Sequence, residues 1–171
     1  MKVEDKIQYI VKWIKDYSET INSQPTTLVV GVSGGIDSAV TSALCAKTNL
    51  NTIVVSMPIK QNPNQYSLSL SHIKWLEDKF QNVKSYIINL DHIFKSFQYL
   101  TKEFDDELAY ANSRSRLRMI ILYQIAQSNK GIVVGTGNKV EDFGIGFYTK
   151  YGDGGVDISP IADCTKTQVW E

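Results

Sequence analysis

Cysteine, arginine and long apolar runs are scarce in this chain of 171 residues. Its two cysteines, Cys45 and Cys164, lie far apart without CxxC spacing, so we expect neither a disulfide framework nor a zinc site. No uninterrupted apolar run approaches the ~18 residues that a membrane span needs, which weighs against a membrane protein. The first residues mix charges early and lack the apolar segment of a secretory signal. The sequence therefore predicts a soluble protein of the cytoplasm.

A surplus of charge of either sign is also missing, because 18 basic residues are balanced by 18 acidic ones. Proteins that bind nucleic acids or membrane surfaces rely on excess positive charge, so we expect neither kind of partner. With 43% apolar residues, the chain is able to bury a substantial core. Its length suits a single domain, at roughly 100–200 residues per domain.

Glycine is absent from residues 1–30 and 36–130 but abundant elsewhere. Three glycines lie within 31–35, and seven lie within 135–155. Glycine is needed where the backbone takes a positive φ or approaches a ligand closely, so two binding loops are predicted. Ordinary turns also collect glycine and are the alternative interpretation, but seven glycines in so short a segment exceed what a turn requires.

Only three of the 18 basic residues are arginines, and they alternate at Arg114, Arg116 and Arg118. The planar guanidinium grips phosphate or carboxylate at two points, which favours an anion-binding role over a solvated helix face. On a helix, Arg114 and Arg118 share a face, whereas Arg116 points about 200° away from Arg114. If Arg116 faces a site in its own chain, the other two should face elsewhere, for example toward a partner subunit.

Hydrophobic periodicity divides the chain into alternating helices and strands. Helices are predicted at 3–21, 37–47, 65–80, 91–101 and 104–128, and short apolar strands at 27–32, 52–57, 84–90 and 132–134. This alternation predicts an α/β fold, with a mostly parallel sheet and helices on both faces. Each glycine-rich loop directly follows a strand, so both should open on one crevice at the carboxyl ends of the strands.

Local signals mark the ends of several helices. A break at Ser23-Gln24-Pro25 should end the first helix. The stripe predicted to be buried on helix 65–80 consists of Leu68, Ile73, Leu76 and Phe80. Thr165 and Gln168 have the spacing of a capping box, so a helix should begin there. Because the chain stops at Glu171, before two turns are complete, we expect a single domain over residues 1–171 that lacks its C-terminal segment.

The segment Gly31-Val32-Ser33-Gly34-Gly35-Ile36-Asp37-Ser38 lies between a predicted strand and a predicted helix. Successive backbone N–H groups, serine hydroxyls and the positive end of the helix together favour binding of a phosphate chain. The loop lacks both the GK[ST] of a Walker motif and the GxGxxG of a nicotinamide-dependent Rossmann enzyme. Asp37 would repel phosphate unless a divalent cation lay between them, so we interpret it as a Mg²⁺ ligand, with Glu141 as a second acid. The alternative for Asp37 is a carboxylate that interacts with the helix dipole.

This loop resembles the SGGxDS signature of the ATP pyrophosphatases, which cleave ATP between its α and β phosphates. A longer downstream run is similar to the signature of the NAD synthetases, and it comprises Gly135–Asp142, Gly146–Asp157, Pro160 and Thr165-Lys166. The segment Asn112–Met119 is similar to the arginine-bearing helix of that family. The resemblance extends from about residue 3 to the end of the chain and implies an adenine nucleotide alpha-hydrolase-like, Rossmann-like fold.

In that family, ATP adenylates the nicotinate carboxylate of deamido-NAD, and ammonia then displaces AMP, so the products are NAD, AMP and pyrophosphate. The resemblance therefore implies the last step of NAD biosynthesis, with Mg²⁺ as the cofactor and ATP as a co-substrate. We expect the ammonia-dependent form, because no glutaminase domain precedes the matching part and Lys150–Gly155 is similar to the type that takes free ammonia. Family members form homodimers with the dinucleotide site at the interface, so a homodimer is implied as well.

The resemblance also implies roles for individual residues. ATP contacts fall on Gly31, Val32, Ser33, Gly34, Gly35, Ile36, Asp37, Ser38, Thr136 and Lys166. Deamido-NAD would be bound by Arg116, Lys150 and Asp157, and Mg²⁺ by Asp37 and Glu141. Asp153 resembles the acid beside the ammonia position, where it would hold ammonium or accept a proton.

Two other functions fit parts of the same pattern. The ATP chemistry could serve another acceptor, such as a tRNA base or a different small acid, although the zero net charge disfavours tRNA. The chain could also be a non-catalytic nucleotide-binding module. Phe147, Tyr148 and Tyr151 would either stack on a nicotinate or adenine ring or pack within the protein. His72 and His92 lie on predicted helices without ligand spacing, so we assign them no catalytic role.

Overall fold

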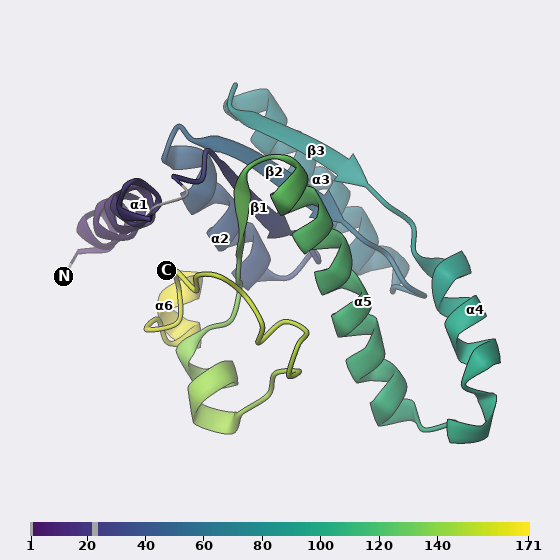
Figure 1. Cartoon of the computed structure of the whole chain (residues 1–171). Helices are drawn as coiled ribbons and strands as arrows, with labels where there is room; N and C mark the ends of the chain where they lie inside the picture. Colours follow the sequence, from purple (N-terminus) through teal and green to yellow (C-terminus); the bar gives the residue numbers. More distant parts are fainter. Residues whose placement is uncertain (1, 22–23) are drawn as a thin grey trace.

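The computed structural model describes residues 2–21 and 24–171, so Ser23 of the predicted break lies outside the described residues. The elements, in chain order, are α1 (Val3–Thr20), β1 (Thr27–Gly31), α2 (Ile36–Lys47), β2 (Asn51–Ser56), α3 (Pro63–Lys79), β3 (Val83–Ile87), α4 (Asp91–Leu100), η1 (Lys102–Phe104), α5 (Glu107–Ser128), β4 (Gly131–Val134), η2 (Lys139–Ile145) and α6 (Lys166–Trp170). This order, drawn in Figure 1, confirms the predicted alternation of strands and helices.

The four strands form one parallel sheet in the order β3-β2-β1-β4. In the sheet register, Val30 of β1 lies opposite Val54 of β2 on one side and Val134 of β4 on the other. The chain moves outward from β1 to β3 and then returns to the other side of β1. The strand order therefore reverses between β1 and β4, and in such sheets a ligand crevice forms at the carboxyl ends of the strands at this point.

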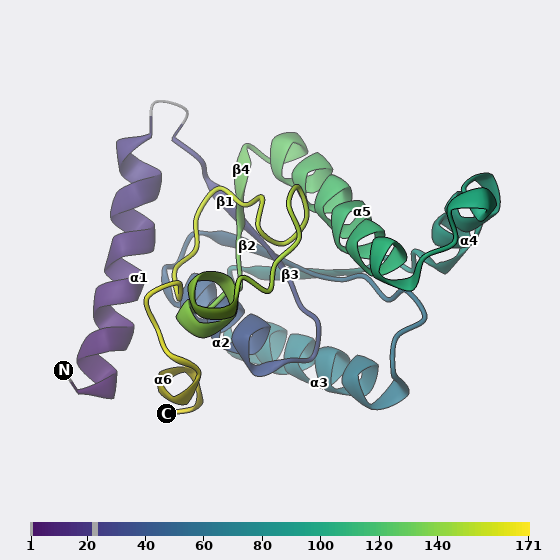
Figure 2. The same cartoon turned by 90° about the horizontal axis from the view of Figure 1, so that it is seen from below.

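Helices cover both faces of the sheet, as predicted (Figure 2). Leu28 and Val30 of β1 pack in a cluster with α1 and α2, whereas Val29 packs on the other face with α4 and α5. A third cluster joins α2 and α3 to β2 and β3. Because both faces are buried, each central strand is a continuous apolar run instead of an alternating one.

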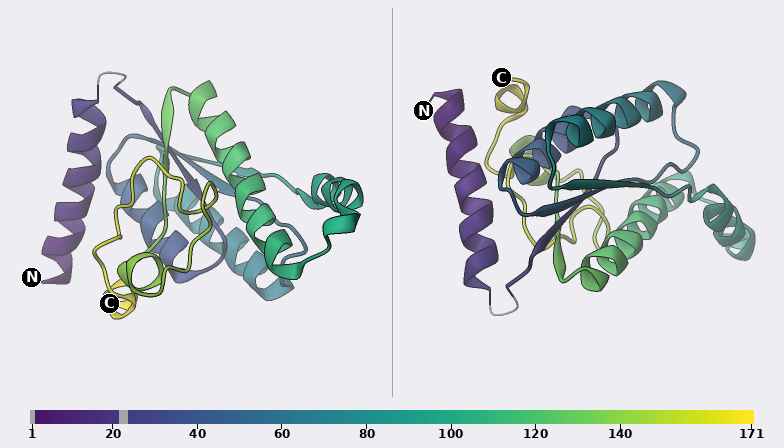
Figure 3. Two further views of the ribbon diagram at one scale, coloured as in Figure 1. Left: turned by 60° about the horizontal axis from the view of Figure 1, so that its bottom comes forward. Right: turned by 90° about the horizontal axis from the view of Figure 1, so that it is seen from above.

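The outer helices lie at opposite ends of the molecule (Figure 3). Helix α1 packs against α2 beside the sheet, and α4 lies beyond the far end of α5. Within the described ranges 2–21 and 24–171, none of the helices combines the length and the apolar character needed to cross a bilayer.

Residues 135–158 form an excursion that leaves β4 and returns to it. Gly135 N donates to Ile158 O at 2.8 Å, and Val134 pairs with Ile158 in a single parallel bridge. The excursion contains the π-helical turn η2, which the periodicity did not predict and whose N-cap is Asn138. It therefore begins and ends at the same strand end.

The capping box predicted at the last helix is present. Thr165 N donates to Gln168 Oε1 at 3.0 Å, and Gln168 N donates to Thr165 Oγ1 at 3.4 Å. Together these bonds satisfy two N–H groups that the first helical turn leaves without partners. They fix the backbone of Lys166, the first residue of α6.

The predicted buried stripe of α3 is wrong at Leu68, which is 58% exposed. Ile73 and Leu76 are buried, and Phe80 packs against the same cluster. The buried position in the first turns is occupied by Ser69, whose hydroxyl donates to Tyr66 O at 2.7 Å. The stripe therefore passes through a serine, which hydrophobicity alone does not reveal.

This packing predicts different stabilities for two leucine variants of α3. Leu76→Ala should lower the free energy of unfolding by about 2–5 kcal/mol, because it removes a fully buried side chain and leaves a cavity. Leu68→Ala, on the same helix, should change it by no more than about 0.5 kcal/mol. Urea unfolding followed by circular dichroism measures both. Equal losses would contradict the observed stripe.

Candidate active site

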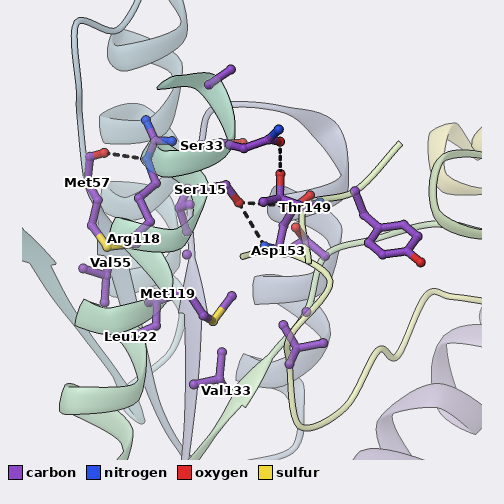
Figure 4. Close-up of a pocket in the computed structure, with 18 of the residues that line it drawn as sticks. Ser33, Val55, Met57, Ser115, Arg118, Met119, Leu122, Val133, Thr149 and Asp153 are labelled. Carbon is purple, nitrogen blue, oxygen red and sulfur yellow. Dashed lines mark hydrogen bonds between the residues drawn. The ribbon is translucent and has the colours of Figure 1, made fainter. Parts of the chain in front are cut away.

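A cavity of about 780 Å³ opens at the carboxyl ends of β1 and β4. The two glycine-rich loops supply part of its wall through Ser33 on one side and Thr136 on the other. The expectation that both loops open on one crevice is confirmed. Figure 4 shows Met119, Leu122 and Val133 among the apolar lining residues. A largely apolar cavity of this size with a few polar groups is typical of a small-molecule site.

Hydrogen bonds between its own residues shape the loop that joins β1 to α2. Ser38 Oγ donates to Gly35 O at 2.9 Å and accepts from Ser33 N at 3.2 Å. Gln61, from the segment after β2, donates to Ser33 O at 2.7 Å. The first N–H groups of α2 have no acceptors within the helix, as in every helix, and lie at its positive end. The loop is therefore suited to binding an anion.

Glycine is required at position 34. Its φ of +92° is a conformation that side-chain-bearing residues rarely adopt. A Cβ atom there would also lie 2.1 Å from the carbonyl oxygen of Gln65 on α3. The loop can approach α3 this closely only because Gly34 has no side chain.

Two acids from separate elements, Asp37 in the first turn of α2 and Glu141 in η2, meet beside this anion-binding loop. Lys166 Nζ donates to Glu141 Oε1 at 2.8 Å and forms an ion pair with Asp37 Oδ2. The fully buried Asn138 donates from Nδ2 to the other oxygen of Asp37 at 2.9 Å. Its Oδ1 accepts from Glu141 N at 3.1 Å. One buried amide thus fixes both acids relative to each other.

Negative charge accumulates at this edge of the cavity. Burial raises the pKa of Asp142, and repulsion from Asp153, Glu141 and Asp37 raises it further. Burial alone would lower the pKa of Lys166, but its hydrogen bonds to Asp37 and Glu141 outweigh burial, so the pKa is raised. The ammonium of Lys166 is therefore stabilised by the acids that it contacts.

The far wall of the cavity is a row of polar contacts between α5 and the excursion (Figure 4). Ser115 Oγ donates to Asp153 Oδ1 at 2.6 Å and accepts from Asp153 N at 3.0 Å. One turn earlier, Asn112 Oδ1 accepts from Thr149 Oγ1 at 2.8 Å. Thr149 N also donates to Asp153 Oδ1, at 3.0 Å. These bonds set the orientation of the Asp153 carboxylate.

The three arginines of α5 lie in different surroundings. Arg118 lines the cavity and donates from Nε to Met57 O at 3.0 Å, whereas Arg116 is exposed and donates to Lys150 O at 3.0 Å. Arg114 lies over the ring of Phe94. The spacing of the arginines fixed their relative directions but not which side of α5 faces the sheet. Burial of Arg118 lowers its pKa, and the charge of Arg114 lowers it further.

Asp157 is held by the protein itself. Its Oδ2 accepts from Val133 N at 2.7 Å, and its Oδ1 accepts from Tyr123 Oη at 3.2 Å. Tyr123 Oη also contacts Gly155 O at 3.0 Å. Partial burial, together with the charge and hydrogen bond of Asp157, raises the pKa of Tyr123 to about 12. These contacts attach the end of the excursion to α5 and β4.

The structure brings together most of the residues with predicted roles. The cavity wall contains Gly31, Val32, Ser33, Thr136 and Asp153. The adjoining loop and acidic cluster contain Gly34, Gly35, Ile36, Asp37, Ser38, Glu141 and Lys166. Arg116, Lys150 and Asp157 do not line the cavity.

Several residues that shape the site were not predicted from the sequence. Asn138 has a recognisable signal, because an Asn three residues before a Glu is typical of a helix N-terminus. Asn112 and Ser115 are spaced by one helical turn, which marks a shared face once the helix is known. Arg118 was noticed, but its direction could not be read from spacing alone.

The fold and the site together define a class, the α/β proteins that place a ligand site at the switch point of a parallel sheet. Comparison with known proteins identifies the family within this class. The profile of the NAD synthase family matches residues 6–171, and the chain therefore belongs to that family. A relative from Saccharolobus solfataricus, an NH3-dependent NAD+ synthetase, is 46% identical over 94% of this chain.

Solved structures support the same assignment. The NMN synthetase of Francisella tularensis superposes with a TM-score of 0.89 at 34% identity, over 99% of this chain and 68% of that one. The NH3-dependent NAD synthetase of Campylobacter jejuni gives a TM-score of 0.88 at 28% identity, over 99% and 71%. The present chain spans 56% of the length of the Saccharolobus relative.

The contacts of Tyr123 predict a stability contribution that depends on pH. Tyr123→Phe should lower the free energy of unfolding by about 1 kcal/mol, because it removes a donor to Asp157 and Gly155. The phenol has a pKa near 12 in the folded protein and 10 as its ordinary value. The difference between wild type and variant should therefore be constant below pH 10 and vanish as the pH rises toward 12. Urea unfolding at a series of pH values measures it, and a constant difference would contradict this role.

Proposed function

We propose that this chain carries the ATP-dependent amidation of deamido-NAD with ammonia, which yields NAD, AMP and pyrophosphate. The observation that carries the proposal is the meeting of Asp37, Glu141 and Lys166 beside the anion-binding loop. Acids at a phosphate site require cations between them and the phosphates, which is the arrangement that nucleotide cleavage needs. The three buried clusters share one sheet, which supports a single synthetase domain over residues 1–171.

Asp37 and Glu141 are the residues that would hold Mg²⁺. Their carboxylate oxygens are the hard donors that Mg²⁺ prefers, and the ammonium between them shows that their charges favour a cation. Over the described residues, no group of three acidic, histidine or cysteine side chains is arranged to hold a metal alone. Two protein carboxylates suit Mg²⁺, which commonly completes its shell with water and substrate phosphates. Bound there, it would neutralise charge on the departing pyrophosphate.

In the first step, a nicotinate carboxylate oxygen attacks the α-phosphorus of ATP, and the bond from that phosphorus to the bridging oxygen breaks. The loop from Gly31 to Ser38 would hold the phosphates, with Thr136 on the facing wall and Lys166 reaching them from α6. The task of these groups is positioning and charge stabilisation, because ATP itself carries the leaving group of this step, pyrophosphate.

In the second step, ammonia attacks the acyl carbon, AMP leaves, and the new nitrogen loses a proton. Asp153 is suited to accept that proton. Two donors hold its Oδ1, and in the described part of the chain no hydrogen bond engages its Oδ2. The carboxylate also lines the cavity. Ser115 and Thr149 would therefore present a free carboxylate oxygen to ammonium.

Deamido-NAD would be bound by Arg116, Lys150 and Asp157, which lie outside the cavity wall. Phe147, Tyr148 and Tyr151 are exposed nearby in the same excursion and could stack on an aromatic ring of the ligand. A site that continues beyond the wall fits a dinucleotide shared with a second subunit. We also propose that the reaction takes place in the cytoplasm, as the sequence analysis predicts.

This proposal predicts a specific set of products. Incubated with ATP, Mg²⁺, ammonium and deamido-NAD, the chain should release AMP and pyrophosphate in equal amounts with NAD. Nicotinate mononucleotide and tRNA, offered in separate reactions, should release none. Asp37→Asn should lose ATP cleavage while keeping its circular dichroism spectrum.

Each deviation has a distinct meaning. Release of ADP and phosphate in place of AMP and pyrophosphate would exclude an adenylation mechanism. Faster release of AMP and pyrophosphate with the mononucleotide would indicate that the substrate is a mononucleotide, as the name of the Francisella NMN synthetase suggests for that protein. Release of AMP and pyrophosphate with tRNA but not with deamido-NAD would show that the proposed acceptor is wrong.

We also propose a homodimer, formed through the α4 patch, which comprises Ile93, Tyr99, Leu100, Phe104 and Leu108. These side chains lie on α4, η1 and the first turn of α5 and are 49–79% exposed. A concentration of exposed apolar side chains of this kind is typical of an interface.

Sedimentation tests the dimer. Wild type should sediment as a dimer, and Leu100→Glu should weaken association at least about tenfold by burying a charge. Tyr9→Glu, at a 62% exposed site on α1, is the matched control and should leave the dimer intact. A monomeric wild type would exclude the proposal, and an unaffected Leu100→Glu would place the interface elsewhere.

A further inference from the structure

The space between the two candidate metal ligands contains a cation that belongs to the chain itself. Lys166 Nζ contacts a carboxylate oxygen of Glu141 at 2.8 Å and a carboxylate oxygen of Asp37. Asn138 engages the other oxygen of Asp37, so the Asp37 oxygen left for a metal is the one that Lys166 contacts, and Glu141 contacts the same ammonium through Oε1. The ammonium therefore competes directly for those oxygens.

The cap of α6 fixes the backbone of Lys166, whereas the ion pairs to Asp37 and Glu141 hold its side chain. Thr165 and Gln168 cap the helix on which it is the first residue. Just before the cap, Cys164 O accepts from Lys139 N at 2.9 Å, which ties this segment to the start of η2. The Lys166 side chain is 38% exposed and has four rotatable methylenes. Its ammonium can therefore leave the acids without any movement of α6.

The charge of the ammonium opposes binding of a divalent metal to the same acids. Asp37 and Glu141 together carry two negative charges, and Lys166 neutralises one of them. A divalent ion beside the ammonium would face strong repulsion at a few ångströms in a partly buried site. For the metal to bind well, the ammonium has to move away.

We propose that Lys166 is a tethered cation that occupies the metal's place and withdraws when a nucleotide enters. The identification of the nucleotide as ATP and of the metal as Mg²⁺ rests on the proposed function. Phosphate oxygens give the ammonium alternative acceptors, and charge-assisted bonds to them replace those to the acids. The site then binds metal and nucleotide as a pair and binds metal alone weakly.

Mn²⁺ is the probe for this inference, because its free aqua ion has an electron paramagnetic resonance signal that binding diminishes. Without nucleotide, Lys166→Met should bind Mn²⁺ about tenfold or more tightly than wild type, because the competing charge is gone. With ATP present, wild type should bind Mn²⁺ more tightly than Lys166→Met, since the variant lacks a contact to the phosphates. Mg²⁺ should displace the bound Mn²⁺ in both proteins.

Two control variants and one substitute for the test variant give each result one meaning. Lys139→Met removes a positive charge from an exposed residue of η2 and should leave Mn²⁺ affinity within about twofold of wild type. The double variant Asp37→Asn, Lys166→Met should lose the gain in Mn²⁺ affinity that Lys166→Met shows alone, because a metal ligand is missing. Lys166→Gln replaces Lys166→Met if the latter does not fold.

The proposal is overturned if Lys166→Met and wild type bind Mn²⁺ equally without nucleotide. It is also overturned if Lys139→Met gives the same gain, because the effect would then be one of overall charge. In wild type with ¹³C-labelled lysine, ATP without metal should shift the Lys166 ε-methylene resonance, and an unshifted signal would show that the ammonium does not withdraw. The metal titration without nucleotide needs no turnover, so its outcome is independent of whether the chain amidates deamido-NAD.

Discussion

The parallel pairing of β1 with β4 is the constraint on which the rest of the structure depends. With Val30 opposite Val134, both strands end at the same level, and their loops emerge side by side. Each strand leads to only one of the two acids that contact Lys166, Asp37 in α2 after β1 and Glu141 in η2 after β4. The sheet register brings the acids within reach of one lysine, and the buried Asn138 links them. A cluster of like charges this close exists only because a cation and an amide compensate it.

The fold was largely predictable from the sequence because its signals are local. Apolar β-branched runs such as Leu28–Val30 identify strands buried on both faces, and Thr165 with Gln168 identifies a helix start. The failures have a common origin. Leu68 was expected in the core, yet Ser69 occupies that position because a serine that bonds to its own helix can be buried. Periodicity ranks residues by hydrophobicity and does not detect polar groups whose hydrogen bonds are satisfied.

The site was predictable in composition but not in arrangement. Glycine-rich loops and acids indicate an anion and a cation, and these residues do come together around the cavity. Spacing could not show that Arg118 rather than Arg116 lines the cavity, because α5 carries apolar side chains on more than one side. The exposed Ile120 lies directly beside the buried Met119, so hydrophobicity does not orient the helix. Only the packed sheet determines which face of α5 turns inward.

The closure of residues 135–158 on β4 has a mechanical consequence for the cavity. Since the segment departs at Gly135 and rejoins at Ile158, one pair of backbone bonds forms a narrow base that separates it from the sheet. A change of shape within the segment leaves the strand register untouched, because no strand of the sheet is formed by its interior. Its hydrogen bonds to α5 each involve a side chain of that helix, namely Asn112, Ser115, Arg116 or Tyr123, and water can replace bonds of this kind. One rim of the cavity can thus adapt to its contents while the frame beneath it stays rigid.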